Sequence, residues 1–171
     1  MEALDTAITE ILPDNREQPG RLLALDLGAK RVGVALSDEL RLTARPLPLI
    51  QRRSWKDLLR QVAEIVESYD ARGLVIGLPL NMNDSHGPAA EEAARLAENF
   101  RRSLSVPVYL QDERLTSEDA AQRLKSAGAG RNEINQRIDS ESAVNILCDF
   151  MAAAPQPREL GKEDSGRRTT A

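Results

Sequence analysis

Three acidic residues, Asp26, Glu113 and Asp139, stand where a folded chain could bring their side chains together. Removing a carboxylate from water is costly unless a cation or hydrogen-bond donors compensate it, and converging carboxylates repel one another unless cations neutralise them. Hard divalent ions such as Mg²⁺ prefer oxygen ligands. Two such ions, roughly 3.5–4 Å apart, stabilise the attacking and leaving oxygens of a phosphodiester displacement. The three acids therefore fit metal-dependent phosphodiester hydrolysis with water as the nucleophile.

The same acids also have structural interpretations. Asp26 interrupts the apolar run Leu22–Leu27 and could cap the turn that begins at Gly28. Asp139 stands at the expected start of the last helix, where an aspartate is a favoured N-cap. Because triplets of acids are common in any charged chain, spacing alone leaves the metal site and the structural roles both open.

Local patterns predict five strands and four helices. Two apolar runs joined by Gly28-Ala29-Lys30 predict a β-hairpin, and Pro46 and Pro48 restrict the third strand to an edge or an irregular segment. The expected strands are Leu22–Leu27, Arg31–Leu36, Thr43–Ile50, Gly73–Gly77 and Val106–Leu110. Helical spacing and capping residues predict helices that begin near Ser54, Pro88, Thr116 and Asp139.

The order of these elements predicts an α/β fold. Buried strands separated by helices imply parallel pairing through crossovers, and the leading hairpin adds antiparallel strands. We expect a mixed five-stranded sheet flanked by helices, the ribonuclease H-like architecture. Ligands of open α/β sheets bind outside the carboxyl ends of the strands. If the strands that lead to Asp26 and Glu113 are adjacent and parallel, their carboxylates converge there, and Asp139 could join from the flanking helix.

Composition and charge set broad limits on the function. The formal net charge is −4, most of it carried by residues 1–20, so charge neither supports nor excludes a polyanionic partner. Aromatic residues make up 3% of the chain, which argues against a base-stacking platform. We expect an N-terminal appendage over 1–20, one domain over 21–151 and a disordered tail over 152–171.

The chain has neither a signal peptide pattern nor an apolar run of membrane-spanning length, so we expect a cytoplasmic protein with no membrane partner. The lone Cys148 lies in an apolar, helix-like stretch and is expected to be a small core residue. One cysteine and one histidine exclude an internal disulfide and a multi-histidine zinc site within one chain.

Three segments resemble the YqgF family, the group of proposed Holliday junction resolvases associated with processing the 5′ end of pre-16S rRNA. These segments are Leu25–Ala35, Ile76–Met82 and Asp112–Thr116. The resemblance covers about residues 21–151 and implies a ribonuclease H-like nuclease. It also implies a divalent metal, Mg²⁺ or Mn²⁺, held by Asp26, Glu113 and Asp139 as the catalytic residues.

The resemblance implies a nucleic-acid partner, with precursor rRNA first and branched DNA as the alternative. Lys30, Arg31 and Arg114 flank the acids and could contact phosphates, because cations position a polyanion without reading its sequence; ordinary surface charge is an equal alternative. A resolvase makes paired cuts, which predicts a symmetric homodimer. For the basic stripe of Arg52, Arg53, Lys56 and Arg60, a solvated helix face is the favoured interpretation.

Two further function classes compete with a nuclease. Actin-like ATPases and sugar kinases also place Asp before Leu-Gly at a hairpin, but they generally need two such domains, which disfavours them for a chain of this length. A nucleic-acid adaptor without catalysis is the other class, and an intact set of three acids argues against it.

Overall fold

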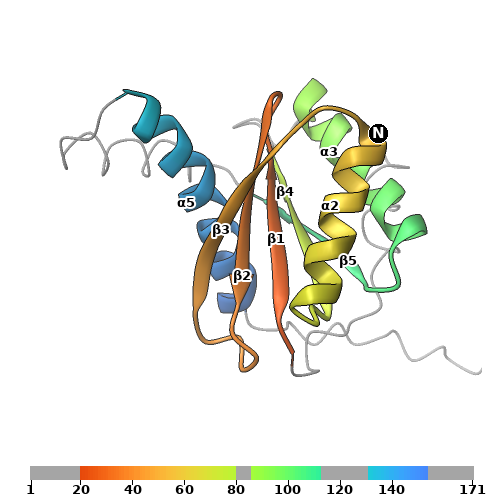
Figure 1. The fold of residues 1–171 in the computed structure, drawn as a ribbon, viewed down its shortest axis with the longest axis vertical. Helices are drawn as coiled ribbons and strands as arrows, with labels where there is room; N and C mark the ends of the chain where they lie inside the picture. The colour runs from red at the N-terminus through yellow and green to blue at the C-terminus, as the bar shows by residue number, and fades with distance from the viewer. Residues whose placement is uncertain (1–19, 80–85, 113–130, 154–171) are drawn as a thin grey trace, which may run out of the picture.

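The computed structural model describes residues 20–79, 86–112 and 131–153, and for residues 131–139 it describes the backbone alone. The predicted helix near Thr116 lies outside these ranges, as do the expected appendage and tail apart from residues 20, 152 and 153. The described elements are β1 (Leu22–Leu27), β2 (Arg31–Ser37), β3 (Ala44–Gln51), α2 (Trp55–Ser68), β4 (Gly73–Leu78), α3 (Pro88–Ser103), β5 (Val108–Asp112) and α5 (Arg131–Ala152) (Figure 1).

The five strands form one mixed sheet in the order β3-β2-β1-β4-β5. The pairs β1–β2 and β2–β3 are antiparallel, whereas β1–β4 and β4–β5 are parallel. The predicted hairpin and mixed five-stranded sheet are therefore confirmed. Strand β3 lies at an edge, as Pro46 and Pro48 predict, and its register with β2 shifts between Val32 and Val34.

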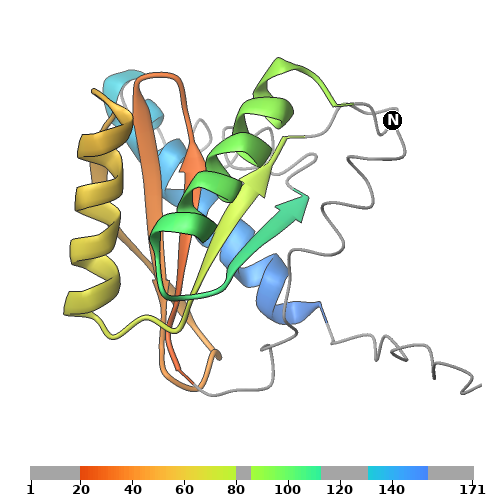
Figure 2. The ribbon, with the colours of Figure 1, turned by 90° about the vertical axis from the view of Figure 1, so that its right-hand side faces the viewer.

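Parallel pairing brings the carboxyl ends of β1, β4 and β5 to one edge of the sheet. Figure 2 shows the three arrowheads at this edge, while β2 runs the other way. We call it the carboxyl edge. The turn between β1 and β2 and the starts of α2 and α3 lie at the same end of the molecule (Figure 1). Residues that follow these strands are thus placed where an open α/β sheet binds its ligands.

Helices cover both faces of the sheet. Leu25, Leu74 and Ile76 belong to the core under α2 and α3, whereas Ala24 and Val75 belong to the core under α5. This alternation follows from the two-residue period of a strand. Within the described ranges, no helix is long and apolar enough to cross a membrane.

Helix α2 begins where the sequence predicts. The Ser54 hydroxyl accepts a hydrogen bond from the Asp57 backbone N–H at 3.2 Å, which satisfies one of the unpaired donors of the first turn. The Trp55 ring meets Phe100 of α3 edge to face, with ring centroids 4.8 Å apart. The start of α2 is therefore tied to α3.

Most strand boundaries differ from the prediction by one or two residues, and the starts of β5 and α5 have a clear physical meaning. Strand β5 begins at Val108 rather than Val106, because Pro107 has no N–H to donate to the ladder. Helix α5 begins at Arg131, so Asp139 lies well inside a helix and its interpretation as an N-cap is wrong.

The expectation that Cys148 is a core residue is also wrong. The buried apolar stripe of α5 consists of Ala143, Ile146, Leu147 and Phe150, and Ser142 beside it is also buried. Cys148 lies off this stripe and is exposed.

We predict that Ile146→Ala lowers the free energy of unfolding by about 2–5 kcal/mol, because its fully buried side chain joins α5 to the sheet. Urea denaturation measures the change. Cys148→Ala on the same helix is the matched control, with an expected change within about 0.5 kcal/mol. Equal losses in the two variants would contradict this packing of α5.

Candidate active site

Asp26 lies near the end of β1, on the sheet face that α5 covers. Its side chain follows Ala24 at the two-residue period of the strand and is partly buried. In the register, Gly33 of β2 is the partner of Asp26. Continuing the β1–β4 register by one residue places Gly77 on the other side, and Gly77 is paired in turn with Gln111 of β5. Both cross-strand neighbours of Asp26 are therefore glycines, and both are buried, so no side chain of β2 or β4 lies directly beside its carboxylate.

Glu113 lies outside the described residues, but the strand that leads to it is defined. Strand β5 ends at Asp112, so Glu113 is the next residue along the chain. The sequence predicts convergence if the strands that lead to Asp26 and Glu113 are adjacent and parallel. They are not adjacent, because β4 lies between β1 and β5. They are parallel, and two strand spacings, roughly 10 Å, separate their axes.

Asp139 is placed by the backbone of α5. It lies one helical turn before Ala143, which is fully buried against the sheet. Figure 1 shows α5 beginning at the end of the molecule where the β1–β2 turn lies and running down the β2 and β3 side of the sheet. The fold thus brings a second element that carries a predicted acid to the face of Asp26.

Among the side chains that the structure describes, no three acidic, histidine or cysteine groups converge as a metal site. Of the three predicted ligands, this set of side chains includes Asp26 alone. The convergence of Asp26, Glu113 and Asp139 therefore stays a prediction. Arg114, a predicted nucleic-acid contact, also lies outside the described residues.

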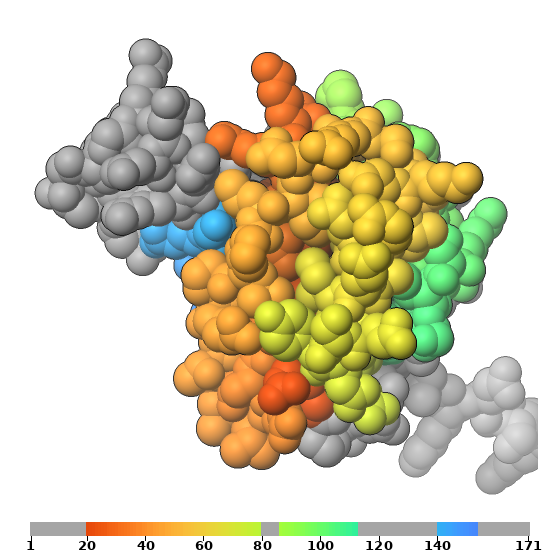
Figure 3. All heavy atoms as spheres, in the orientation of Figure 1, coloured from red at the N-terminus to blue at the C-terminus, as the bar shows by residue number. Residues whose placement is uncertain are grey.

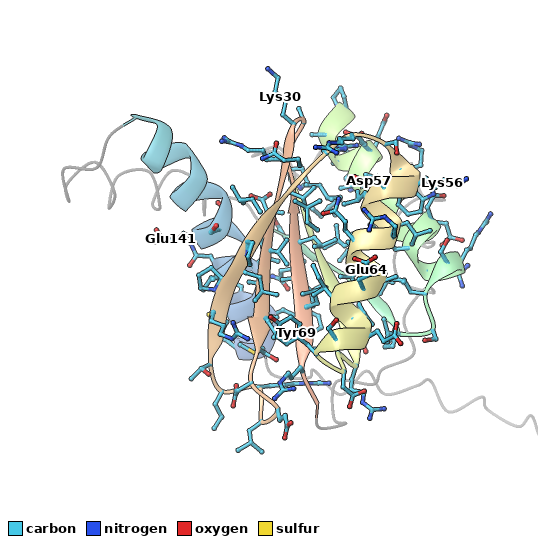
Figure 4. All side chains as sticks on the ribbon, viewed as in Figure 1. Lys30, Lys56, Asp57, Glu64, Tyr69 and Glu141 are labelled. Atoms are coloured by element: carbon cyan, nitrogen blue, oxygen red, sulfur yellow. The ribbon has the colours of Figure 1, made fainter. Side chains whose placement is uncertain are left out.

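The turn after Asp26 has a tight geometry. The Gly28 N–H donates to the carbonyl oxygens of Asp26 at 3.2 Å and of Arg31 at 3.0 Å. A Cβ at Gly28 would lie 2.5 Å from the Arg31 carbonyl oxygen, so glycine is required. Lys30 is exposed at the tip of this turn, where Figure 4 shows it pointing away from the sheet. Arg31 is partly buried and pairs in the β2–β3 register with Gln51.

Arg52 holds this turn in place. Its guanidinium donates to the Gly28 carbonyl oxygen at 2.9 Å and forms an ion pair with Glu92 of α3. Its backbone N–H donates to the Lys30 carbonyl oxygen at 2.9 Å. The side chain is 18% exposed, so Arg52 connects the β1–β2 turn, the link between β3 and α2, and α3.

Sequence reasoning did not separate Arg52 from its basic neighbours. The pattern around Ser54 gives charge and helical position, whereas the partners of Arg52 come from the β1–β2 turn and from α3, which are distant in sequence.

We predict that Arg52→Ala lowers the free energy of unfolding by about 1–2 kcal/mol, because the Gly28 carbonyl and the Glu92 carboxylate lose a charged donor. Urea denaturation measures this loss, and hydrogen exchange at the Gly28 amide is expected to accelerate. The control is Arg60→Ala, whose ion pairs with Asp57 and Glu64 lie on the exposed side of α2; its expected loss is about 0.5 kcal/mol or less. Equal hydrogen-exchange rates of the Gly28 amide in the two variants would contradict the role of Arg52 in holding the turn.

Comparison with known proteins agrees with this geometry. A proposed pre-16S rRNA nuclease of Anaeromyxobacter sp. (strain Fw109-5) is 41% identical over 131 residues, which cover 77% of this chain and 96% of that protein. A protein of the same description from Pelotomaculum thermopropionicum is 39% identical over 148 residues, covering 85% of this chain and 96% of the relative.

The fold class is confirmed by a solved structure, that of T. thermophilus RuvC in complex with a Holliday junction substrate. Its TM-score is 0.50 at 14% sequence identity, and the match covers 78% of this chain and 97% of RuvC. The chain therefore has the ribonuclease H-like fold. Residues 20–153 match the RuvX family, which is described as Holliday junction resolvase. The predicted YqgF resemblance and the predicted class of enzyme, a hydrolase of phosphodiester bonds, are confirmed at the level of the family: the chain belongs to the RuvX family.

Proposed function

We propose that this protein is a metal-dependent nuclease that hydrolyses phosphodiester bonds in processing the 5′ end of pre-16S rRNA. The observation that carries the proposal is the Asp26 carboxylate at the carboxyl edge of a ribonuclease H-like sheet, with glycines as its cross-strand neighbours. The relatives described as pre-16S rRNA nucleases support the choice of substrate.

In this proposal Asp26, Glu113 and Asp139 hold the metal. Their carboxylate oxygens are the ligands that Mg²⁺ and Mn²⁺ prefer, and the glycines at positions 33 and 77 place no competing side chain beside Asp26. The bound cation would activate water and neutralise charge that develops on the phosphate. Asp26 would fix the position of the cation relative to the sheet.

The neighbouring cations have a separate role. Lys30, Arg31 and Arg114 would contact phosphates on either side of the cleaved bond and position the strand without reading its sequence. The exposed position of Lys30 at the turn after Asp26 supports this role.

We also propose the domain boundaries and the location expected from the sequence. Residues 21–151 would form the nuclease domain, with 1–20 and 152–171 as accessory segments. The bacterial relatives whose named substrate is pre-16S rRNA support a cytoplasmic location.

Resolution of four-way DNA is the second candidate. It is favoured by the description of the matching family as Holliday junction resolvase. Two cuts related by symmetry would require a homodimer whose two active sites face one junction.

We predict that Asp26→Asn lowers the rate of metal-dependent cleavage roughly a hundredfold or more, since even residues that support metal ligands contribute about ten- to a hundredfold. Cleavage of a pre-16S 5′ fragment with Mg²⁺ or Mn²⁺ measures it. Asp70→Asn is the control: Asp70 is exposed, and its φ of 50° suits asparagine. Full activity of Asp26→Asn would refute the role of this residue.

We predict faster cleavage of the pre-16S 5′ fragment than of a four-way DNA junction when both are present at equal concentration with the same metal. The ratio of kcat/KM values measures the preference. Preferential cutting of the junction by a dimer would instead support the resolvase candidate.

A further inference from the structure

Most described cations are paired with carboxylates. Seven arginines form ion pairs within 4.0 Å: Arg21, Arg52, Arg60, Arg72, Arg95, Arg101 and Arg102. In the part of the chain that the structure describes, the side chains of Lys30, Arg53 and Lys56 form no ion pair or hydrogen bond. We call these three residues the edge patch.

The edge patch extends from the β1–β2 turn to the first turn of α2. Lys30 is at the tip of the β1–β2 turn, and the hydrogen bond from the Arg52 N–H to the Lys30 carbonyl oxygen brings the backbone before Arg53 beside this turn. Lys56 is in the first turn of α2. Figure 4 shows Lys30 projecting from the tip of the turn and Lys56 on the outer side of α2, and Figure 3 shows the β1–β2 turn projecting beside the start of α2.

Acidic groups near the edge patch are engaged elsewhere. Asp57 accepts hydrogen bonds from Arg60 and Gln61, each at 2.8 Å; the bond from Arg60 is the largest cause that lowers the pKa of the Asp57 carboxyl, and the nearby charge of Arg53 lowers it further. Glu92 pairs with Arg52 and Arg95. Paired charges largely cancel in the surrounding solvent, whereas the three exposed cations of the edge patch do not.

The sheet separates Asp26 from the helix that carries Lys56. Asp26 faces the α5 side of the sheet, and α2 covers the opposite side. A strand that passes from Asp26 over the end of β1 toward α2 crosses the turn that carries Lys30. Arg53 and Lys56 continue the path on the other side of that turn.

We propose that the edge patch binds the phosphates of a nucleic-acid strand beyond the cleaved bond and guides that strand from Asp26 over the β1–β2 turn to the start of α2. The proposal rests on the proposed nuclease function and extends it to a substrate surface on α2. The recognised group is the phosphodiester backbone, which RNA and DNA share. Contacts of this kind position a strand without reading its sequence.

The test compares three double variants with the wild-type chain. Arg53→Gln/Lys56→Gln removes two charges of the edge patch, and Arg53→Lys/Lys56→Arg keeps them. Arg101→Gln/Arg102→Gln is the charge-matched control, because both arginines lie at the end of α3, away from the carboxyl edge, and are paired with Glu98. Binding of a short single-stranded RNA and of the same DNA sequence is measured across a salt series, with a chelator present to prevent cleavage.

We expect the slope of the logarithm of affinity against the logarithm of salt concentration to decrease by roughly 1.4 in Arg53→Gln/Lys56→Gln, about 0.7 for each lost phosphate contact. The loss should be the same for RNA and DNA, and the other two variants should match the wild type. An unchanged slope, an equal loss in the α3 control, a loss confined to one nucleic acid, or no binding by the wild type would overturn the proposal.

Cleavage gives a separate result. With metal and the pre-16S 5′ fragment, Arg53→Gln/Lys56→Gln should raise KM and leave kcat near the wild-type value, because a uniform binding contact has been removed. Absence of cleavage by the wild-type chain would refute the proposed nuclease function, while the salt slopes would still decide whether the edge patch binds phosphates.

Discussion

The parallel pairing of β1, β4 and β5 is the constraint on which the candidate site depends. Because side chains alternate between the two faces of a strand, the register Leu25–Ile76–Leu110 assigns Asp26 and Gln111 to the opposite, α5-covered face. A slip of β1 by one residue would turn Asp26 into the apolar core under α2 and α3, where an uncompensated carboxylate is strongly unfavourable. Burial of the apolar residues of β1 therefore determines the face of the sheet on which the Asp26 side chain lies. Stability of the sheet and orientation of the candidate site come from the same register.

The site combines two glycines beside Asp26 with a firmly held turn. Gly33 and Gly77 place no side chain next to Asp26, and a strand interior is weakened where glycine replaces a side chain that could pack. The local structure is supported from outside the sheet, because Arg52 connects the turn at Gly28 to Glu92 of α3. The end of β1 is therefore held by residues that are distant in sequence, although the neighbouring strands contribute no side-chain packing beside Asp26.

Local signals predicted those parts of the fold that local chemistry determines. The apolar runs gave the hairpin, Ser54 gave the start of α2, and the two prolines gave the edge position of β3. These local signals could not predict the order of the strands, because β4 lies between β1 and β5 through pairing that no local pattern specifies. Ile134 and Ile138, four residues apart, could have extended the last helix toward Arg131. The error at Cys148 was avoidable, because the spacing of Ala143, Ile146, Leu147 and Phe150 already places position 148 off the buried stripe.

The charges show why composition was a poor guide to partners. A net charge of −4 describes the whole chain, but a polyanion responds to the local field, and the field depends on which charges are paired. Arg101 and Arg102 add little to it because both are paired with Glu98, whose pKa is lowered to about 2 by their hydrogen bonds and which therefore stays ionised. Arg53 and Lys56 have the same formal charge and no such partner in the described part of the chain. The two helix ends thus differ in how their cations are engaged: those at the end of α3 are held in ion pairs with Glu98, whereas Arg53 and Lys56 at the start of α2 are exposed and form no ion pair in the described part of the chain.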